Sequence, residues 1–129
     1  MLTVIRGNAG RPAAGGGDTF TGTVLRSPVL PETDGISVGS VVFSPCARTH
    51  WHSHPGGQLL IVVAGEGFVA DADGPVRVTT GDTVWTPPGV RHWHGACDTQ
   101  PLVHTAVTVG GVEWAEPVSE EQFSAALGG

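Results

Sequence analysis

The chain has 129 residues, which is enough for one compact domain with one hydrophobic core. Charged residues make up only 14% of the sequence and apolar residues 40%, a composition that excludes an intrinsically disordered chain. The net charge is -6 and no cluster of basic residues is present, so we do not expect nucleic-acid binding, because nothing would neutralise the phosphates.

The N-terminal residues and the cysteines indicate a cellular location. The segment from Met1 to Arg6 is too short and too quickly polar for a signal peptide. No apolar run approaches the roughly 20 residues that span a bilayer. Cys46 and Cys97 are too few for a disulfide framework, and we interpret both as free thiols. We therefore expect a cytoplasmic protein without membrane contact.

The 20 glycines and 10 prolines predict many tight turns between short strands. Residues 1–18 are expected to form a flexible N-terminal arm, because residues 7–18 are rich in Gly, Ala and Pro. Residues 19–129 are expected to form a single domain. β-rich segments predict strands at residues 20–25, 36–43, 58–64, 68–70, 76–78, 83–86 and 102–109.

Turn residues separate these strands. Two prolines predict a loop over residues 27–34, and residues 65–67 predict a turn that pairs 68–70 with 58–64. Asp73-Gly74 and Gly81-Asp82 predict further turns. Many short strands at this spacing are typical of a sandwich or barrel.

The end of the chain predicts the one helix. Ser119 and Gln122 have the spacing of a capping box, in which each side chain bonds the backbone N–H of the other. A short helix is therefore expected over residues 120–127, ended by Gly128.

Four residues have the pattern of a metal site. His52 and His54 are two residues apart, so on a strand both rings point to the same face. A Pro-Gly-Gly turn then returns the chain to Gln58, and His92 follows a Pro-Pro-Gly turn far downstream. Three imidazoles and one amide oxygen leave open coordination positions on a divalent ion, which substrate or water can fill. The alternatives are histidines that hold no metal, and a Gln58 that only hydrogen-bonds a histidine ring.

These residues resemble the cupins. The first cupin motif is G-x5-H-x-H-x(3,4)-E-x6-G and the second is G-x5-P-x-G-x2-H-x3-N. This chain matches every spacing, with its ligand candidates at the motif positions, but it departs at three places: Cys46 for Gly, Gln58 for Glu and Ala96 for Asn. The resemblance covers about residues 20–125. It implies an all-β fold, a jelly-roll β-barrel with the metal inside and a short C-terminal helix, and commonly a homodimer.

The glutamine at position 58 changes the charge of the site. A glutamate ligand would cancel one charge of a divalent ion, whereas Gln58 leaves it at +2. The ion is then a stronger Lewis acid and favours anionic ligands such as cyanide, an alkoxide or an enolate.

Further histidines lie near the four candidate ligands. His94 shares strand parity with His92, and His50 shares the parity of His52, so both can face the barrel interior. His104 lies on the last long strand. Neutral imidazoles suit proton transfer near pH 7, and the alternative is that they orient the ligands. By the same parity, Trp51 and Trp93 point away from the ligands and pack outside the barrel or at a dimer seam, whereas Trp85 is a candidate for an apolar pocket wall.

A narrower resemblance concerns a bacterial cupin subgroup that includes manganese-dependent hydroxynitrile lyases. It rests on residues 20–24, 43–55, 93–95, 112–114 and 118–122. It implies that a cyanohydrin hydroxyl binds the metal, that histidines move the proton and that cyanide leaves. The implied metal ligands are His52, His54, Gln58 and His92, and the implied catalytic residues are His94, His104, Thr49 and His50. Those lyases carry Gln where this chain has Thr108, and Ala where it has His50.

Three functions remain open from the sequence. The first is a metal-dependent lyase for cyanohydrins, with Mn(II) as cofactor and with Fe(II), Ni(II) or Zn(II) as alternatives. The second is a metal-dependent dioxygenase, and the third is a binding protein without catalysis. A small-molecule substrate and a homodimer or homotetramer are expected.

Overall fold

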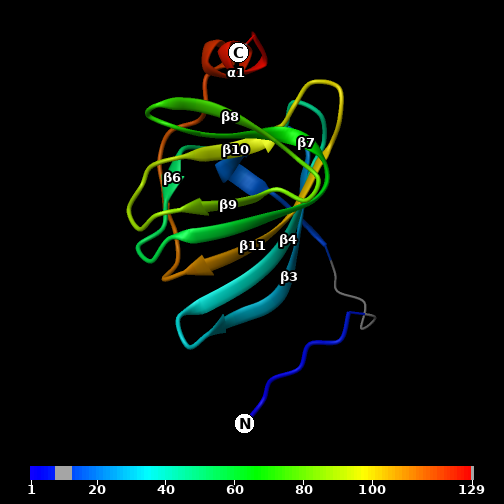
Figure 1. The fold of residues 1–129 in the computed structure, drawn as a ribbon, viewed down its shortest axis with the longest axis vertical. Coiled ribbons are helices and arrows are strands. Elements are labelled where there is room, and N and C mark those ends of the chain that lie inside the picture. Colours follow the sequence, from blue (N-terminus) through cyan, green and yellow to red (C-terminus); the bar gives the residue numbers. More distant parts are fainter. Residues whose placement is uncertain (8–12, 129) are drawn as a thin grey trace.

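Short antiparallel strands form almost all of the regular structure, and one helix follows them (Figure 1). The structure is a computed structural model and describes residues 1–7 and 13–128. Its elements are β1 (Ala14–Gly15), the 3-10 helix η1 (Gly17–Thr19), β2 (Phe20–Thr21), β3 (Val24–Thr33), β4 (Ile36–Phe43), β5 (Arg48–Thr49), β6 (His52–Ser53), β7 (Gln58–Asp71), β8 (Gly74–Thr79), β9 (Thr83–Thr86), β10 (Trp93–Ala96), β11 (Leu102–Val109), β12 (Glu113–Trp114) and α1 (Glu120–Gly128).

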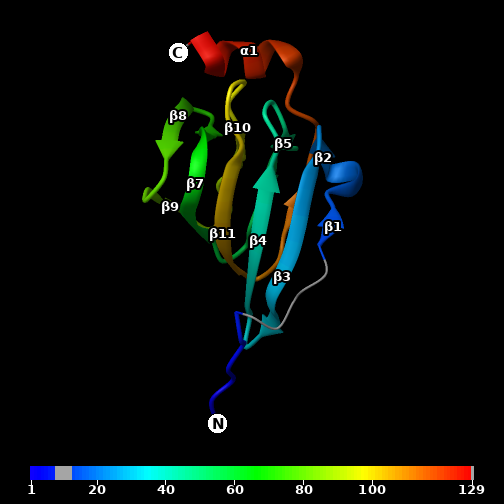
Figure 2. The same ribbon diagram turned by 90° about the vertical axis from the view of Figure 1, so that its right-hand side faces the viewer.

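The strands form one curled sheet in the order β1-β3-β4-β11-β7-β10-β5-β2. The strands β8 and β9 also pair with β7, and β12 pairs with β6 in a small second sheet. Figure 2 shows β3, β4 and β11 side by side along one wall, with α1 closing one end. The expected all-β jelly-roll barrel with a C-terminal helix is confirmed.

The strand β7 joins the two walls of the barrel. Its first half pairs with β11 and β9, and its second half pairs with β10 and β8. The predicted turn at residues 65–67 is therefore wrong, because the strand bends there without reversing. Gly65 has a φ of 87°, and a Cβ at this position would lie 1.8 Å from the carbonyl oxygen of Pro101. The glycine allows close approach of two backbones at the bend.

The predicted loop over residues 27–34 is also wrong, because β3 continues to Thr33. The register between β3 and β4 shifts on both sides of Leu30, next to the prolines. An edge strand with bulges tolerates proline because the missing N–H has no ladder partner. The reversal comes at Asp34 and Gly35, whose φ values of 53° and 83° are typical of a two-residue hairpin turn.

The predicted N-terminal arm is shorter than expected. The strand β1 pairs with β3, with Ala14 opposite Arg26 and Gly15 opposite Leu25, and η1 follows directly. Residues 14–19 therefore belong to the domain, because their small side chains allow the backbone to add a strand at the sheet edge. Residues 1–7 are exposed, and residues 8–12 of the predicted arm lie outside the described residues.

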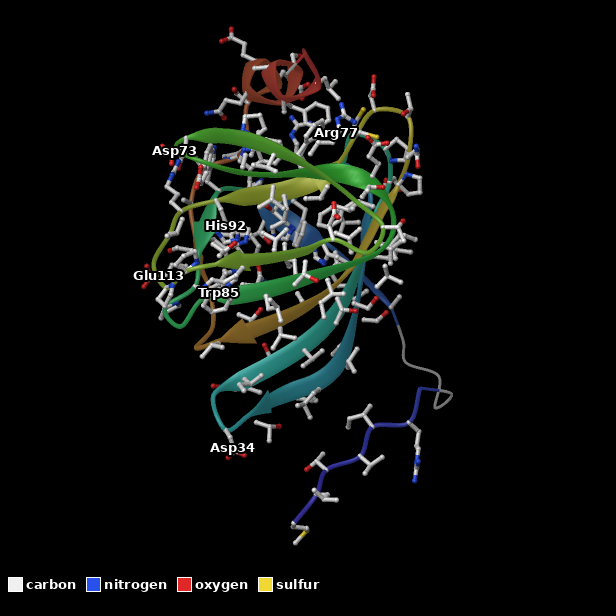
Figure 3. The ribbon with its side chains drawn as sticks, in the orientation of Figure 1. Asp34, Asp73, Arg77, Trp85, His92 and Glu113 are labelled. Atoms are coloured by element: carbon white, nitrogen blue, oxygen red, sulfur yellow. The ribbon has the colours of Figure 1, made fainter. Side chains whose placement is uncertain are left out.

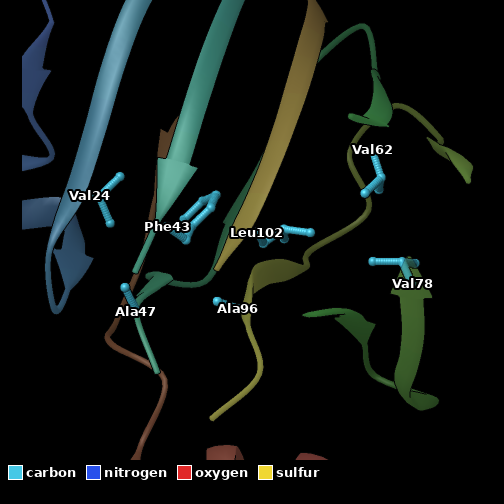
Figure 4. Packing of buried hydrophobic residues seen from close by; sticks show 7 residues of the cluster. All are labelled: Val24, Phe43, Ala47, Val62, Val78, Ala96 and Leu102. Atoms are coloured by element: carbon cyan, nitrogen blue, oxygen red, sulfur yellow. The ribbon is translucent and has the colours of Figure 1, made fainter. Parts of the chain in front are cut away.

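Two apolar clusters support the barrel. One fills part of its interior, and Figure 4 shows its buried members Val24, Phe43, Ala47, Val62, Val78, Ala96 and Leu102. The other lies between the outer face of the barrel and α1, and includes Phe68, Trp93 and Phe123. Trp93 is thus buried outside the barrel, as its parity predicted.

The C-terminal helix begins as the capping box predicted. The Ser119 N–H donates to Gln122 Oε1 at 2.9 Å, and the Gln122 N–H donates to Ser119 Oγ at 3.1 Å. Arg48 is buried beneath the helix, where it donates to Glu120 and stacks on the Phe123 ring. None of the helices among the described residues is long and apolar enough to cross a bilayer.

Candidate metal centre and active site

Three histidines converge inside the barrel. His52 lies on β6 and His92 directly precedes β10, and their backbones exchange two hydrogen bonds of 2.9 Å. His54 follows β6, and one ring nitrogen from each of the three lies within 4.8 Å of the others. All three are buried. Figure 3 places His92 among the side chains between the strands.

Backbone carbonyls fix the tautomer of each ring. The Nδ1 atoms of His52, His54 and His92 lie 2.8, 2.8 and 3.0 Å from the carbonyl oxygens of residues 50, 111 and 90. A carbonyl oxygen only accepts, so each Nδ1 carries the proton and each neutral ring keeps a lone pair on Nε2. The buried Nε2 of His54 has no hydrogen-bond partner among the described residues. The three Nε2 atoms are therefore available as a metal-ligand set.

Burial keeps these rings neutral. It lowers the pKa of His52 to about 3 and that of His92 to about 4, and it lowers the pKa of His54 as well. Only a neutral imidazole can bind a metal, so burial prepares the ligands near pH 7.

Gln58, at the start of β7, supplies an oxygen to the same point. Its Nε2 donates to the Thr108 hydroxyl at 3.0 Å, which turns Oε1 towards the histidines, 3.4 Å from His92 Nε2. Since His92 carries its proton on Nδ1, two lone pairs face each other across this gap. A cation between them resolves the repulsion, so the residues present fit a divalent metal.

A second histidine pair lies beside this set. His104 on β11 and His94 on β10 share a hydrogen bond of 2.9 Å between His104 Nε2 and His94 Nδ1. Both are buried, and His94 Nε2 and His104 Nδ1 have no other partner among the described residues. Burial lowers the pKa of His94 well below its ordinary value and that of His104 to about 4. The pair is therefore neutral, with one proton in the shared hydrogen bond.

The two groups open on a cavity of about 470 Å³. Its wall includes His52, His54, Gln58, His94, His104 and Thr49. The Thr49 hydroxyl accepts a hydrogen bond of 3.2 Å from the His94 backbone N–H. His92 lies in the metal-ligand set beside this wall. Together with the six wall residues, it makes seven of the eight predicted site residues that the structure brings together.

A cupin domain model matches residues 39–108 of this chain. The chain is also 43% identical to the (R)-mandelonitrile lyase of Granulicella tundricola over 123 residues, which cover 88% of this chain and 94% of that protein. This chain belongs to the cupin family.

Solved structures agree with the family. A cupin-like protein from Thermotoga maritima superposes with a TM-score of 0.87 at 41% identity, covering 93% of this cupin and 96% of that chain. A conserved protein with a double-stranded β-helix domain from Klebsiella pneumoniae superposes with a TM-score of 0.64 at 28% identity, covering 72% and 84%.

The structure leaves His50 apart from the other predicted catalytic residues. The chain leaves the strand at residues 50–51, between β5 and β6, so the parity used to predict its direction does not hold. His50 does not line the cavity and contributes its backbone carbonyl to His52 instead. Trp85 is 53% exposed on the outer face of β9, so it is not a wall of this cavity either.

A C-terminal strap, residues 110–116, completes the site in a way that strand patterns did not predict. The Gly111 carbonyl accepts the His54 Nδ1 proton, and the Trp114 ring lies 4.8 Å from the His52 ring. Trp114 also meets Phe20 edge-on at 5.5 Å. The adjacent glycines at 110 and 111, both with positive φ, were the available signal for a sharp bend that brings the strap back over the ligands.

Proposed function

We propose that this cupin is a metal-dependent lyase that cleaves and forms cyanohydrins, with Mn(II) as its cofactor. The observation that carries the proposal is the neutral His94–His104 pair beside the three converging histidines and Gln58. Each ring of the pair has one nitrogen without a partner among the described residues. A protein that only bound a ligand would not need this pair for proton transfer. The similarity to a protein named (R)-mandelonitrile lyase supports the same assignment.

The histidine pair supplies the proton chemistry of cyanohydrin cleavage. When the His94 Nδ1–H donates to His104 Nε2, His94 Nε2 carries a lone pair and can accept the hydroxyl proton of the substrate. The O–H electron pair then forms the carbonyl double bond, and the carbon–carbon bond to the nitrile breaks. Cyanide leaves with that bonding pair and takes the proton from His94, so the products are an aldehyde or ketone and hydrogen cyanide.

The ligand atoms narrow the choice of metal. A divalent cation held by His52, His54, His92 and Gln58 would act as a Lewis acid that makes a neighbouring hydroxyl group more acidic. Imidazole nitrogens suit Fe(II), Ni(II) and Zn(II), while the amide oxygen favours Mn(II) or Fe(II). Manganese is supported mainly by the resemblance to the manganese-dependent lyases.

Cyanide release from racemic mandelonitrile tests the function. The protein is loaded with Mn(II), and cyanide is measured with and without a chelator. Release that the chelator abolishes is expected. Oxygen consumption by the iron-loaded protein, without cyanide release, would instead indicate a dioxygenase.

We also propose that the protein is cytoplasmic and a homodimer or homotetramer. Exposed apolar side chains on neighbouring strands support self-association, namely Ile61, Val63, Val76 and Trp85. Light scattering on the eluting protein measures the mass directly, and a monomer at every concentration would contradict the proposal.

A further inference from the structure

Among the residues that the structure describes, one charged side chain lines the cavity. The other residues of the wall in the described part of the chain are apolar or carry hydroxyl, amide or neutral imidazole groups, and the exception is Arg26 on β3. A guanidinium remains protonated at every relevant pH. The cavity thus carries a fixed positive charge apart from the metal-ligand set.

Arg26 differs from the arginines elsewhere on the domain. Three of those arginines pair with glutamates, as Arg48–Glu120, Arg77–Glu66 and Arg91–Glu116. Within residues 1–7 and 13–128, Arg26 forms no ion pair with a carboxylate, and its guanidinium lies 5.2 Å from the centre of the Phe20 ring. Its hydrogen-bond donors are therefore available to a bound molecule.

The sheet register fixes where Arg26 points. Arg26 lies opposite Val41, and Val41 lies opposite His104, so the three form one row across β3, β4 and β11. Residues in one row of an antiparallel sheet point to the same face, so Arg26 shares the inner face with His104. Two strand spacings separate their backbones, or about 9–10 Å.

The neighbouring row of the sheet leaves room for a ligand between Arg26 and His104. Pro28, Gly39 and Ala106 lie opposite one another on the same three strands. A Cβ at Gly39 would meet only the Ser27 carbonyl oxygen, at 3.7 Å. The small residues form a floor that an organic molecule can cover from the histidine pair to Arg26.

We propose that the substrate of this site carries a carboxylate, which Arg26 binds at the outer end of the cavity. The inference rests on the proposed function and names its substrate class, a cyanohydrin whose organic group ends in a carboxylate. A guanidinium matches a carboxylate through two parallel N–H donors. No second Lys or Arg side chain lies on the described wall, so a monoanion fits better than a phosphate.

Calorimetric binding of two matched probes to the Mn(II)-loaded protein tests the proposal without turnover. The probes are 4-(hydroxymethyl)benzoate and its neutral amide, 4-(hydroxymethyl)benzamide. The acid should bind about fivefold more tightly at low ionic strength, since Arg26 is exposed and its charge is partly screened. The substitution Arg26→Gln should remove that preference.

Two controls separate this proposal from others. Arg77→Gln removes the same charge near α1 (Figure 3), at a residue that does not line the cavity, and should keep the preference for the acid. The preference should also survive in metal-free protein. Two results would overturn the proposal. In the first, the wild type binds the two probes equally or binds neither. In the second, the preference for the acid persists in Arg26→Gln and disappears without metal. A protein that prefers the acid but releases no cyanide would contradict the lyase and leave the role of Arg26 standing.

Discussion

The side chain of Gln58 donates from its amide nitrogen to the Thr108 hydroxyl, across the pair of strands β7 and β11. The same hydrogen bond turns the amide oxygen towards His92. Without it, the amide could rotate and present its nitrogen, which cannot bind a metal, to the histidines. Thr108 therefore determines which atom of Gln58 belongs to the ligand set.

Removing that hydroxyl should weaken metal binding. In Thr108→Val, which keeps the shape of the side chain, we expect the affinity for Mn(II) to fall about tenfold, as for other residues that orient metal ligands. Competition with a fluorescent chelator measures this affinity. Thr108→Ser retains the hydroxyl and should stay near the wild type. An unchanged affinity in Thr108→Val would show that Gln58 is oriented by something else.

The charge of the fourth ligand should control anion binding. Gln58→Glu should keep the metal but bind cyanide about tenfold less tightly, because the carboxylate cancels one of the two charges that attract the anion. Cyanide titration of the metal-loaded variant, followed by calorimetry, gives this constant. Tighter cyanide binding in the variant would contradict the charge argument.

His94 should be needed for turnover and not for metal binding. We expect His94→Ala to lower cyanide release by about 10²–10⁴-fold, the usual contribution of a general base, while the bound metal stays stoichiometric. His50→Ala is the matched control, since its side chain does not line the cavity. If the metal-loaded His94→Ala protein keeps its full rate, another group is the base.

The metal-free protein should lose stability as the pH falls. Burial lowers the pKa of His104 to about 4, below the value near 6.5 of an unfolded histidine. Because the unfolded chain takes up the proton first, the free energy of unfolding is highest above pH 6.5 and decreases down to about pH 4, by up to ~3 kcal/mol for this residue.

Urea unfolding at several pH values between 7.5 and 4.5 measures this loss. Substitution of His104 by Asn removes one titrating group, so the slope of stability against pH should fall by about 1.4 kcal/mol per pH unit. A stability that does not change with pH in the metal-free wild type would mean that the histidines are not buried in the neutral form.

Strand and turn spacing predicted a sandwich or barrel, and the resemblance to the cupins predicted the barrel. Local spacing also predicted that His52, His54 and His92 converge. His52 and His54 are two residues apart on the chain, and the turn before His92 is encoded by its own prolines. Strand positions such as 36–43 and 102–109 were confirmed for the same reason.

Features that depend on tertiary contacts could not be predicted in this way. Gly65 looks like a turn residue in sequence, but the close approach of Pro101 makes it a bend within β7. The prolines of β3 look like a loop until their edge position is known, although the strand continues to Thr33 and the reversal comes at Asp34 and Gly35. The direction of His50 depends on the break between β5 and β6, which strand parity does not reveal.

One divalent ion in the histidine and glutamine site should support cyanohydrin cleavage. The most direct test is cyanide release from mandelonitrile measured against metal occupancy, as metal-free protein is titrated with Mn(II). We predict that release rises in proportion to bound metal and reaches its maximum at one ion per chain. A fully occupied protein that releases no cyanide, or a rate that does not depend on occupancy, would contradict the account.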